Sequence, residues 1–218
     1  PLLAALRERL VPLVRTIVDR PAPDASCLKR FFPAAVQWEL SLEVLRRMGR
    51  RGGAGEYREL IAGLRESVPG IALRSSFITG FPGEDRASFG RLRDFVEETR
   101  FDWLAVFAYS PEEGTRAAGM PGRCAERTAR SRAEDLLALE EEVMREKAEA
   151  RVGGLERVLV EGPSEVASGY CEARSGREAP EVDGLIFVPE DQVGEVPGFA
   201  LVELVEAEGI DLIGHVRG

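Results

Sequence analysis

Residues 71–109 combine two extended, largely apolar segments with a stretch of helical periodicity between them. The extended segments are residues 71–79 and 102–109, and residues 87–99 place apolar side chains on one helical face. Parallel strands need a crossover connection of this length, usually a helix, so the pattern predicts a βαβ unit and an α/β fold. The second segment is almost continuously apolar, which predicts a strand covered on both faces.

Apolar residues at helical spacing predict further helices on both sides of this unit. These cover residues 2–19, 42–48, 56–67 and 125–151, the last being long and highly charged. Residues 20–41 have no clear period, and we expect a loop there.

The composition changes at residues 152–154, Val-Gly-Gly, and a different architecture is predicted beyond them. Turn residues there separate five short strand-like segments, namely 155–161, 167–173, 184–188, 199–206 and 210–216. Short strands at such even spacing are typical of a small antiparallel β-barrel. We therefore expect two domains, residues 1–152 and residues 153–218.

The bulk composition is that of a packed protein without a membrane span. The chain has 218 residues, 44% of them hydrophobic, and no apolar run near the ~20 residues that a membrane helix needs. Its three cysteines, Cys27, Cys124 and Cys171, are scattered, which argues against a disulfide framework and favours the cytoplasm. Because the sequence starts with Pro1, we expect a piece of a longer protein.

The negative charge is concentrated in the second domain. Residues 153–218 carry 14 acidic residues and four arginines, a net charge of −10, whereas residues 1–152 carry a net charge of +1. Such a surface repels phosphate backbones and attracts basic partners. We expect Arg174 and Arg177 to form ion pairs inside this acidic domain, and His215 to have a structural role.

Three short strings mark candidate functional segments. The first, Gly80-Phe81-Pro82-Gly83-Glu84, follows the first strand and precedes a helix whose N-cap region is expected at residues 85–88. Its glycines permit close approach of a ligand to the backbone, but the glycine pair taken alone is explained better by a tight turn without a ligand. The other two strings are residues 107–115, Phe-Ala-Tyr-Ser-Pro-Glu-Glu-Gly-Thr, and residues 179–184, Ala-Pro-Glu-Val-Asp-Gly.

Together these strings resemble the radical-SAM methylthiotransferases, in particular the branch that modifies a ribosomal protein. The resemblance covers residues 41–218 well and residues 1–40 poorly. It implies the C-terminal part of a radical-SAM, TIM-like barrel followed by a small antiparallel β-barrel of the TRAM type.

The resemblance also implies a set of residues that contact S-adenosylmethionine. Arg74 would face the barrel interior, since it shares one strand face with Ser76 and Ile78. The other implied contacts are Gly80, Phe81, Pro82 and Tyr109. A structural salt bridge of Arg74 and a backbone hydrogen bond of Tyr109 remain open alternatives.

The family requires two four-iron clusters, each held by three clustered cysteines. Cys27, Cys124 and Cys171 have no such spacing, so we assign no metal ligand and no catalytic residue to this sequence.

The resemblance implies methylthiolation of an aspartate side chain on a basic ribosomal protein of the small subunit. A tRNA methylthiotransferase is the first alternative, but it predicts a basic second domain, so we favour the protein substrate over tRNA. A non-catalytic acidic binding protein and a poorly folding remnant are the others.

Overall fold

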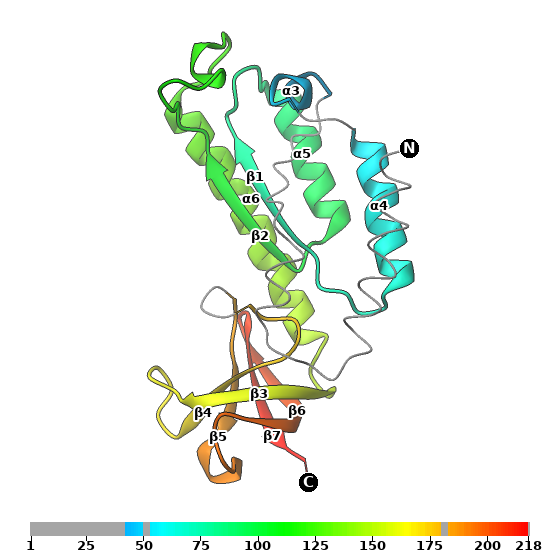
Figure 1. Cartoon of the computed structure of the whole chain (residues 1–218), viewed down its shortest axis with the longest axis vertical. Helices are drawn as coiled ribbons and strands as arrows, with labels where there is room; N and C mark the ends of the chain where they lie inside the picture. The colour runs from blue at the N-terminus through cyan, green and yellow to red at the C-terminus, as the bar shows by residue number, and fades with distance from the viewer. Residues whose placement is uncertain (1–41, 50–52, 180–182, 218) are drawn as a thin grey trace. The chain divides into compact units, whose positions relative to one another are not determined.

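The computed structural model describes residues 42–49, 53–179 and 183–217 (Figure 1). The helix predicted over residues 2–19 and the loop predicted over residues 20–41 lie outside these ranges. Among the helices of the described residues, none combines the length and the hydropathy that a membrane span requires.

The predicted βαβ unit is present. β1 (Arg74–Thr79) and β2 (Trp103–Ala108) pair in parallel along their full length, and α5 (Arg86–Thr99) connects them. The strands are also joined just before the sheet begins. There the Asp102 backbone N–H donates to the Leu73 carbonyl (2.9 Å), and the Asp102 carboxylate accepts from the Leu73 N–H (2.7 Å). These two bonds help to set the register of the sheet.

Both ends of α5 are formed by local hydrogen bonds. The Asp85 side chain is the N-cap and accepts from the Ser88 backbone N–H at 2.7 Å, which confirms the predicted cap region. At the other end Arg100 adopts the left-handed conformation (φ 49°), and its N–H donates to the Val96 carbonyl. The helix therefore ends at Thr99, three positions before Asp102.

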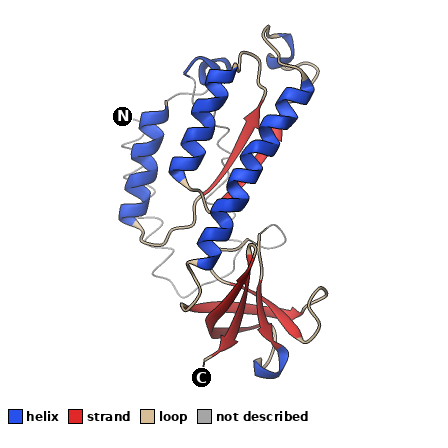
Figure 2. Cartoon of the chain, turned by 180° about the vertical axis from the view of Figure 1, so that it is seen from behind, coloured by secondary structure: helices blue, strands red, loops and turns tan. Residues whose placement is uncertain are grey.

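One face of the sheet packs against helices. Three further helices are present: α3 (Leu42–Arg47), α4 (Ala54–Ser67) and α6 (Glu126–Glu149). Figure 2 shows α5 and α6 in front of the two strands. Phe77 of β1 is fully buried beneath them and contacts Phe101 edge to face, with ring centroids 5.8 Å apart. The same core contains Ile61, Leu73, Leu92, Phe95, Val96, Leu136 and Leu139.

The prediction that both faces of the second strand are buried is wrong. Leu104 and Val106 pack against the core, but the alternate residues of β2 lie on the opposite face, and Phe107 is 56% exposed. In the described part of the chain the sheet has two strands, with the core on one face. The apolar run of residues 102–109 therefore correctly predicted a parallel strand, but it did not predict that one face of this strand is exposed.

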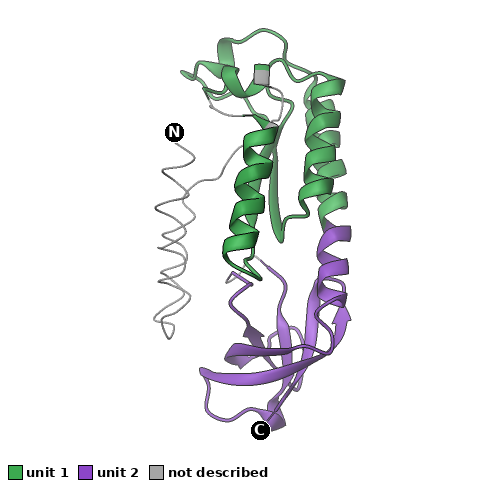
Figure 3. Cartoon of the chain, turned by 90° about the vertical axis from the view of Figure 1, so that its right-hand side faces the viewer, with its two compact units in different colours: residues 1–140 green, residues 141–218 purple. Residues whose placement is uncertain are grey.

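The chain divides into two units, residues 1–140 and 141–218, and the division falls within α6 (Figure 3). The described residues of the second unit form a closed five-stranded β-barrel in the order β3-β4-β5-β7-β6. Its strands are β3 (Leu155–Pro163), β4 (Tyr170–Arg174), β5 (Ile186–Pro189), β6 (Gly198–Glu208) and β7 (Asp211–Val216), and a short 3-10 helix, η2 (Glu190–Gln192), follows β5. A second 3-10 helix, η1 (Ala117–Gly119), lies in the first unit.

The barrel is not antiparallel throughout. Four neighbouring pairs are antiparallel, but β5 and β7 pair in parallel. A closed ring of five strands cannot alternate direction at every neighbour, so at least one pair has to be parallel. The interior is apolar and includes Val158, Val160, Ala173, Ile186, Val188, Val202, Leu204 and Leu212.

Candidate functional site

The turn after β1 is hydrogen-bonded internally. The Gly80 N–H donates to a carboxylate oxygen of Glu84 (2.9 Å), the Glu84 N–H donates to the Phe81 carbonyl (2.9 Å), and the Gly83 N–H donates to the Gly122 carbonyl (2.9 Å). These three donors are therefore already used within the protein. The side chains of Phe81 and Pro82, which lie beside these donors, are buried as well.

A buried ion pair supports the turn, and sequence reasoning missed it. The Glu84 side chain has no exposed surface and pairs with Arg132 of α6. The Arg132 guanidinium also donates to the Glu84 carbonyl (3.3 Å) and lies over the Phe89 ring, 5.3 Å from its centroid. Glu84 closes a recognisable motif, but no signal in the sequence marks a residue 48 positions later as its partner.

The glycine at the start of the turn is required by its contact with α6. Gly80 has φ +76°, and a Cβ there would lie 2.3 Å from the Cβ of Ala129. The Thr79 hydroxyl donates to the Ala129 carbonyl (2.8 Å), which holds the strand end against the helix. This close packing explains Gly80 without a ligand.

Gly80→Ala is expected to lower the free energy of unfolding by about 2–4 kcal/mol, because it adds left-handed backbone strain to a steric overlap. Urea denaturation of the purified chain measures the loss. Gly90→Ala is the control, since a Cβ at Gly90 meets no atom within 4 Å and an alanine favours the helix by about 0.5–1 kcal/mol. Equal effects of the two changes would contradict the packing argument.

Four of the five predicted contact residues lie together. Tyr109 follows β2 and donates its N–H to the Thr79 carbonyl (2.8 Å), next to the turn of Gly80, Phe81 and Pro82. The rings of Phe81 and Tyr109 meet edge to face, 5.3 Å between centroids. The Tyr109 hydroxyl oxygen is buried, and among the described residues it has no hydrogen-bond partner.

The fifth, Arg74, is at the other end of the same strand. It lies on the sheet face opposite the helical core, with its guanidinium over the Trp103 ring at 5.4 Å. Gly80 is six positions further along the chain, which is about 20 Å along an extended strand. Arg74 therefore shares the open face of the sheet without being adjacent to the turn.

Metal-ligating side chains do not gather in the described part of the chain, where no three Cys, His, Asp or Glu residues could hold one ion. Cys124 is half-buried, with its thiol 3.8 Å from the Gly80 carbonyl. Cys171 is inside the barrel, and burial, followed by the nearby charge of Glu190, raises the pKa of its thiol.

Most arginines of the barrel are neutralised by nearby carboxylates. Arg174 pairs with Glu161 at 2.8 Å, as expected, and Arg217 pairs with Glu203. The charge of Arg177 acts on Glu156. His215 shares a hydrogen bond with the side chain of Gln192, which fits a structural role. Six further acidic residues of the barrel are exposed, so much of its acidic charge faces solvent: Glu165, Glu190, Asp191, Glu195, Glu206 and Glu208.

Known proteins resemble the chain in both parts. Residues 152–216 match the TRAM domain family. A protein of Geotalea uraniireducens is 43% identical over 175 residues, 79% of this chain and 38% of the relative. A protein of Geobacter sulfurreducens is 37% identical over 204 residues, 94% of this chain and 44% of the relative. Both are named ribosomal protein uS12 methylthiotransferase RimO.

The resemblance inferred from the three strings is therefore confirmed, and so is the TRAM domain at the end of the chain. The chain spans about two-fifths of the length of these curated relatives.

Proposed function

We propose that this chain, a relative of the RimO proteins along most of its length, is the C-terminal portion of a radical-SAM methylthiotransferase. In this proposal residues 1–152 form part of the catalytic barrel and residues 153–218 form a substrate-docking TRAM domain. The substrate is the basic ribosomal protein uS12, and the group modified is an aspartate side chain. A ribosomal substrate places this activity in the cytoplasm.

The open face of the two-stranded sheet supports a barrel. In a TIM-like barrel helices cover the outside of each strand, and the other face points inward. Arg74 and Trp103 lie on the face away from the helical core. They correspond to the interior in this arrangement.

At the C-terminal ends of β1 and β2, one buried polar group is compatible with a bound cofactor. The buried Tyr109 hydroxyl lacks a partner among the described residues, so a ligand with a polar group can satisfy it. Phe81, Pro82 and Gly80 would form an apolar wall beside it. S-adenosylmethionine and two four-iron clusters supply the radical and the sulfur in this family; the residues named here would bind the cofactor and exclude water.

The observation that carries the choice of substrate is the net charge of −10 on residues 153–218. An RNA-binding surface is expected to be basic, because most of its affinity comes from contacts with phosphates. A basic protein is the better electrostatic match, which favours uS12 over tRNA.

Binding of the purified chain to uS12 and to tRNA, across a salt series, tests this proposal. Binding to uS12 is expected to weaken as salt rises, because dissolved ions screen the attraction between opposite charges. The Debye length, over which this attraction decays, is about 10 Å at 0.1 M salt. Preference for tRNA would support the tRNA-modifying alternative. Binding of uS12 without methylthiolation, once the missing portion is supplied with its cofactors, would instead favour a non-catalytic binding protein.

A further inference from the structure

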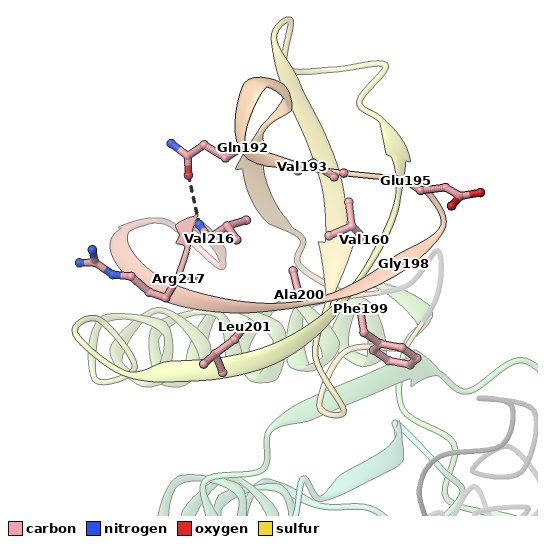
Figure 4. Close-up of a pocket in the computed structure, with 11 residues that line it drawn as sticks. Val160, Gln192, Val193, Glu195, Gly198, Phe199, Ala200, Leu201, Val216 and Arg217 are labelled. Atoms are coloured by element: carbon pink, nitrogen blue, oxygen red, sulfur yellow. Dashed lines mark hydrogen bonds between the residues drawn. The ribbon is translucent and has the colours of Figure 1, made fainter.

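A pocket opens at one end of the barrel, with a volume of ≈ 330 Å³. It is lined by Val160 of β3, residues 192–195 after η2, the start of β6 and the end of β7 (Figure 4). The side-chain oxygen of Gln192 accepts from the Val216 backbone N–H (3.1 Å), which joins two of these walls. The pocket is thus built by segments that the barrel itself holds in place.

Two large apolar side chains are exposed on the outer face of β6, at the rim of this pocket, whereas Ala200 of the same strand faces inward with Val160 and Val193 (Figure 4). Phe199 is 57% exposed and Leu201 is 46% exposed, and both line it. Val196, which follows the pocket-lining Glu195 in the sequence, is 36% exposed. A group of exposed apolar side chains around a hollow is typical of a surface that binds another molecule.

The charge around the pocket identifies the kind of partner. Glu190, Asp191 and Glu195 are exposed, and Glu195 lines the pocket. Of the two nearby arginines, Arg217 pairs with Glu203, and Arg157 lies over the Phe199 ring at 4.3 Å and offsets one of the three carboxylates. The charge that remains is negative, which disfavours a nucleic acid.

We propose that this pocket is the docking site for a basic segment of the protein substrate. This inference rests on the proposed function and assigns it a location. The apolar lining takes an apolar side chain or the aliphatic stem of a lysine or arginine, and the carboxylates of residues 190–195 meet the cationic groups.

The two ends of the barrel provide a matched test. The double variant Asp191→Asn/Glu195→Gln removes two charges at the pocket. Glu206→Gln/Glu208→Gln removes two exposed charges at the far end of β6, about 20 Å from Leu201 along the strand. We expect the first variant to raise the Kd for uS12 about tenfold and the second to change it less than about twofold.

A second pair of variants tests whether apolar side chains at the pocket contribute to uS12 binding. Leu201→Ala is expected to weaken uS12 binding about tenfold. Val205→Ala, which trims another exposed side chain of β6, is expected to leave it unchanged. Unaltered thermal unfolding would show that each variant retains its fold.

The results separate the two proposals. If the wild-type chain binds uS12 but the two double variants raise the Kd equally, the pocket is not the docking site and the proposed function stands. If the unmodified chain does not bind uS12, both proposals are overturned.

Discussion

Replacing Arg132 with methionine is expected to lower the free energy of unfolding of the first unit by about 3–5 kcal/mol. The change leaves the Glu84 carboxylate, whose side chain has no exposed surface, without the guanidinium that pairs with it. The cost is large because a buried charge loses its compensating partner in a poorly solvated site. The Gly80 turn loses part of its support at the same time.

Tryptophan fluorescence during urea denaturation measures this effect. Both tryptophans of the chain, Trp38 and Trp103, precede the barrel in the sequence, so the signal does not follow the barrel directly. Arg130→Met is the control, since Arg130 forms an exposed pair with Glu126 on the same helix. It is expected to cost less than about 0.5 kcal/mol.

A double variant separates the charge from the packing. Glu84→Gln/Arg132→Met removes both charges and keeps an oxygen that can accept from the Gly80 N–H. It is expected to recover much of the loss, because replacing both partners of a buried pair is close to neutral. If Arg132→Met costs no more than Arg130→Met, the pair does not stabilise the turn.

The local elements of this fold could be predicted from sequence because their causes are local. Helix 87–99 was expected from its periodicity and its cap, and α5 spans Arg86–Thr99. The five barrel strands were also expected close to their observed positions. Alternating hydrophobicity and turn residues indicate which segments are strands. The parallel pairing of β5 with β7 is not visible in them, because it follows from closing a barrel with an odd number of strands.

The candidate site was predictable only in part. Gly80, Phe81 and Pro82 lie beside Tyr109 because the ends of adjacent parallel strands meet at one sheet edge, and their contact with S-adenosylmethionine stays a prediction. The use of the turn's N–H groups was not predictable. Glu84 and Gly122 accept from them, and Gly122 comes from a distant part of the chain. The sequence string 80–84 therefore indicated the turn, whereas tertiary contacts determine which backbone N–H groups of the turn a ligand can reach.

A second ionic cluster, partly buried, is centred on Arg151, whose side chain is 16% exposed. Its guanidinium makes two hydrogen bonds with Glu156 (2.9 and 2.8 Å) and one with Glu178 (2.6 Å). The Glu178 side chain is 3% exposed and also accepts from the backbone N–H and the hydroxyl of Ser175. Arg151 thus joins the entry of the barrel to the segment after β4.

Burial by itself would raise the pKa of Glu156, but the hydrogen bond and charge of Arg151 outweigh it and hold the pKa below its ordinary value. A carboxyl whose pKa is lower in the folded state binds fewer protons there than in the unfolded state. Its stabilising contribution is therefore present above the unfolded pKa and is lost as the pH falls through the folded pKa. The barrel should thus lose stability in acid partly through Glu156.

Arg151→Met is expected to destabilise the barrel by about 3–5 kcal/mol at neutral pH, because it leaves two carboxylates close together without their cation. The loss should shrink as the pH falls below the ordinary pKa of glutamate, since protonation then removes the uncompensated charges. Far-UV circular dichroism during urea denaturation, at a series of pH values, measures both effects. Arg145→Met, which breaks only an exposed pair with Glu149, should cost less than about 0.5 kcal/mol. A loss for Arg151→Met that is independent of pH would mean that packing of the arginine stem, rather than its charge, stabilises the barrel.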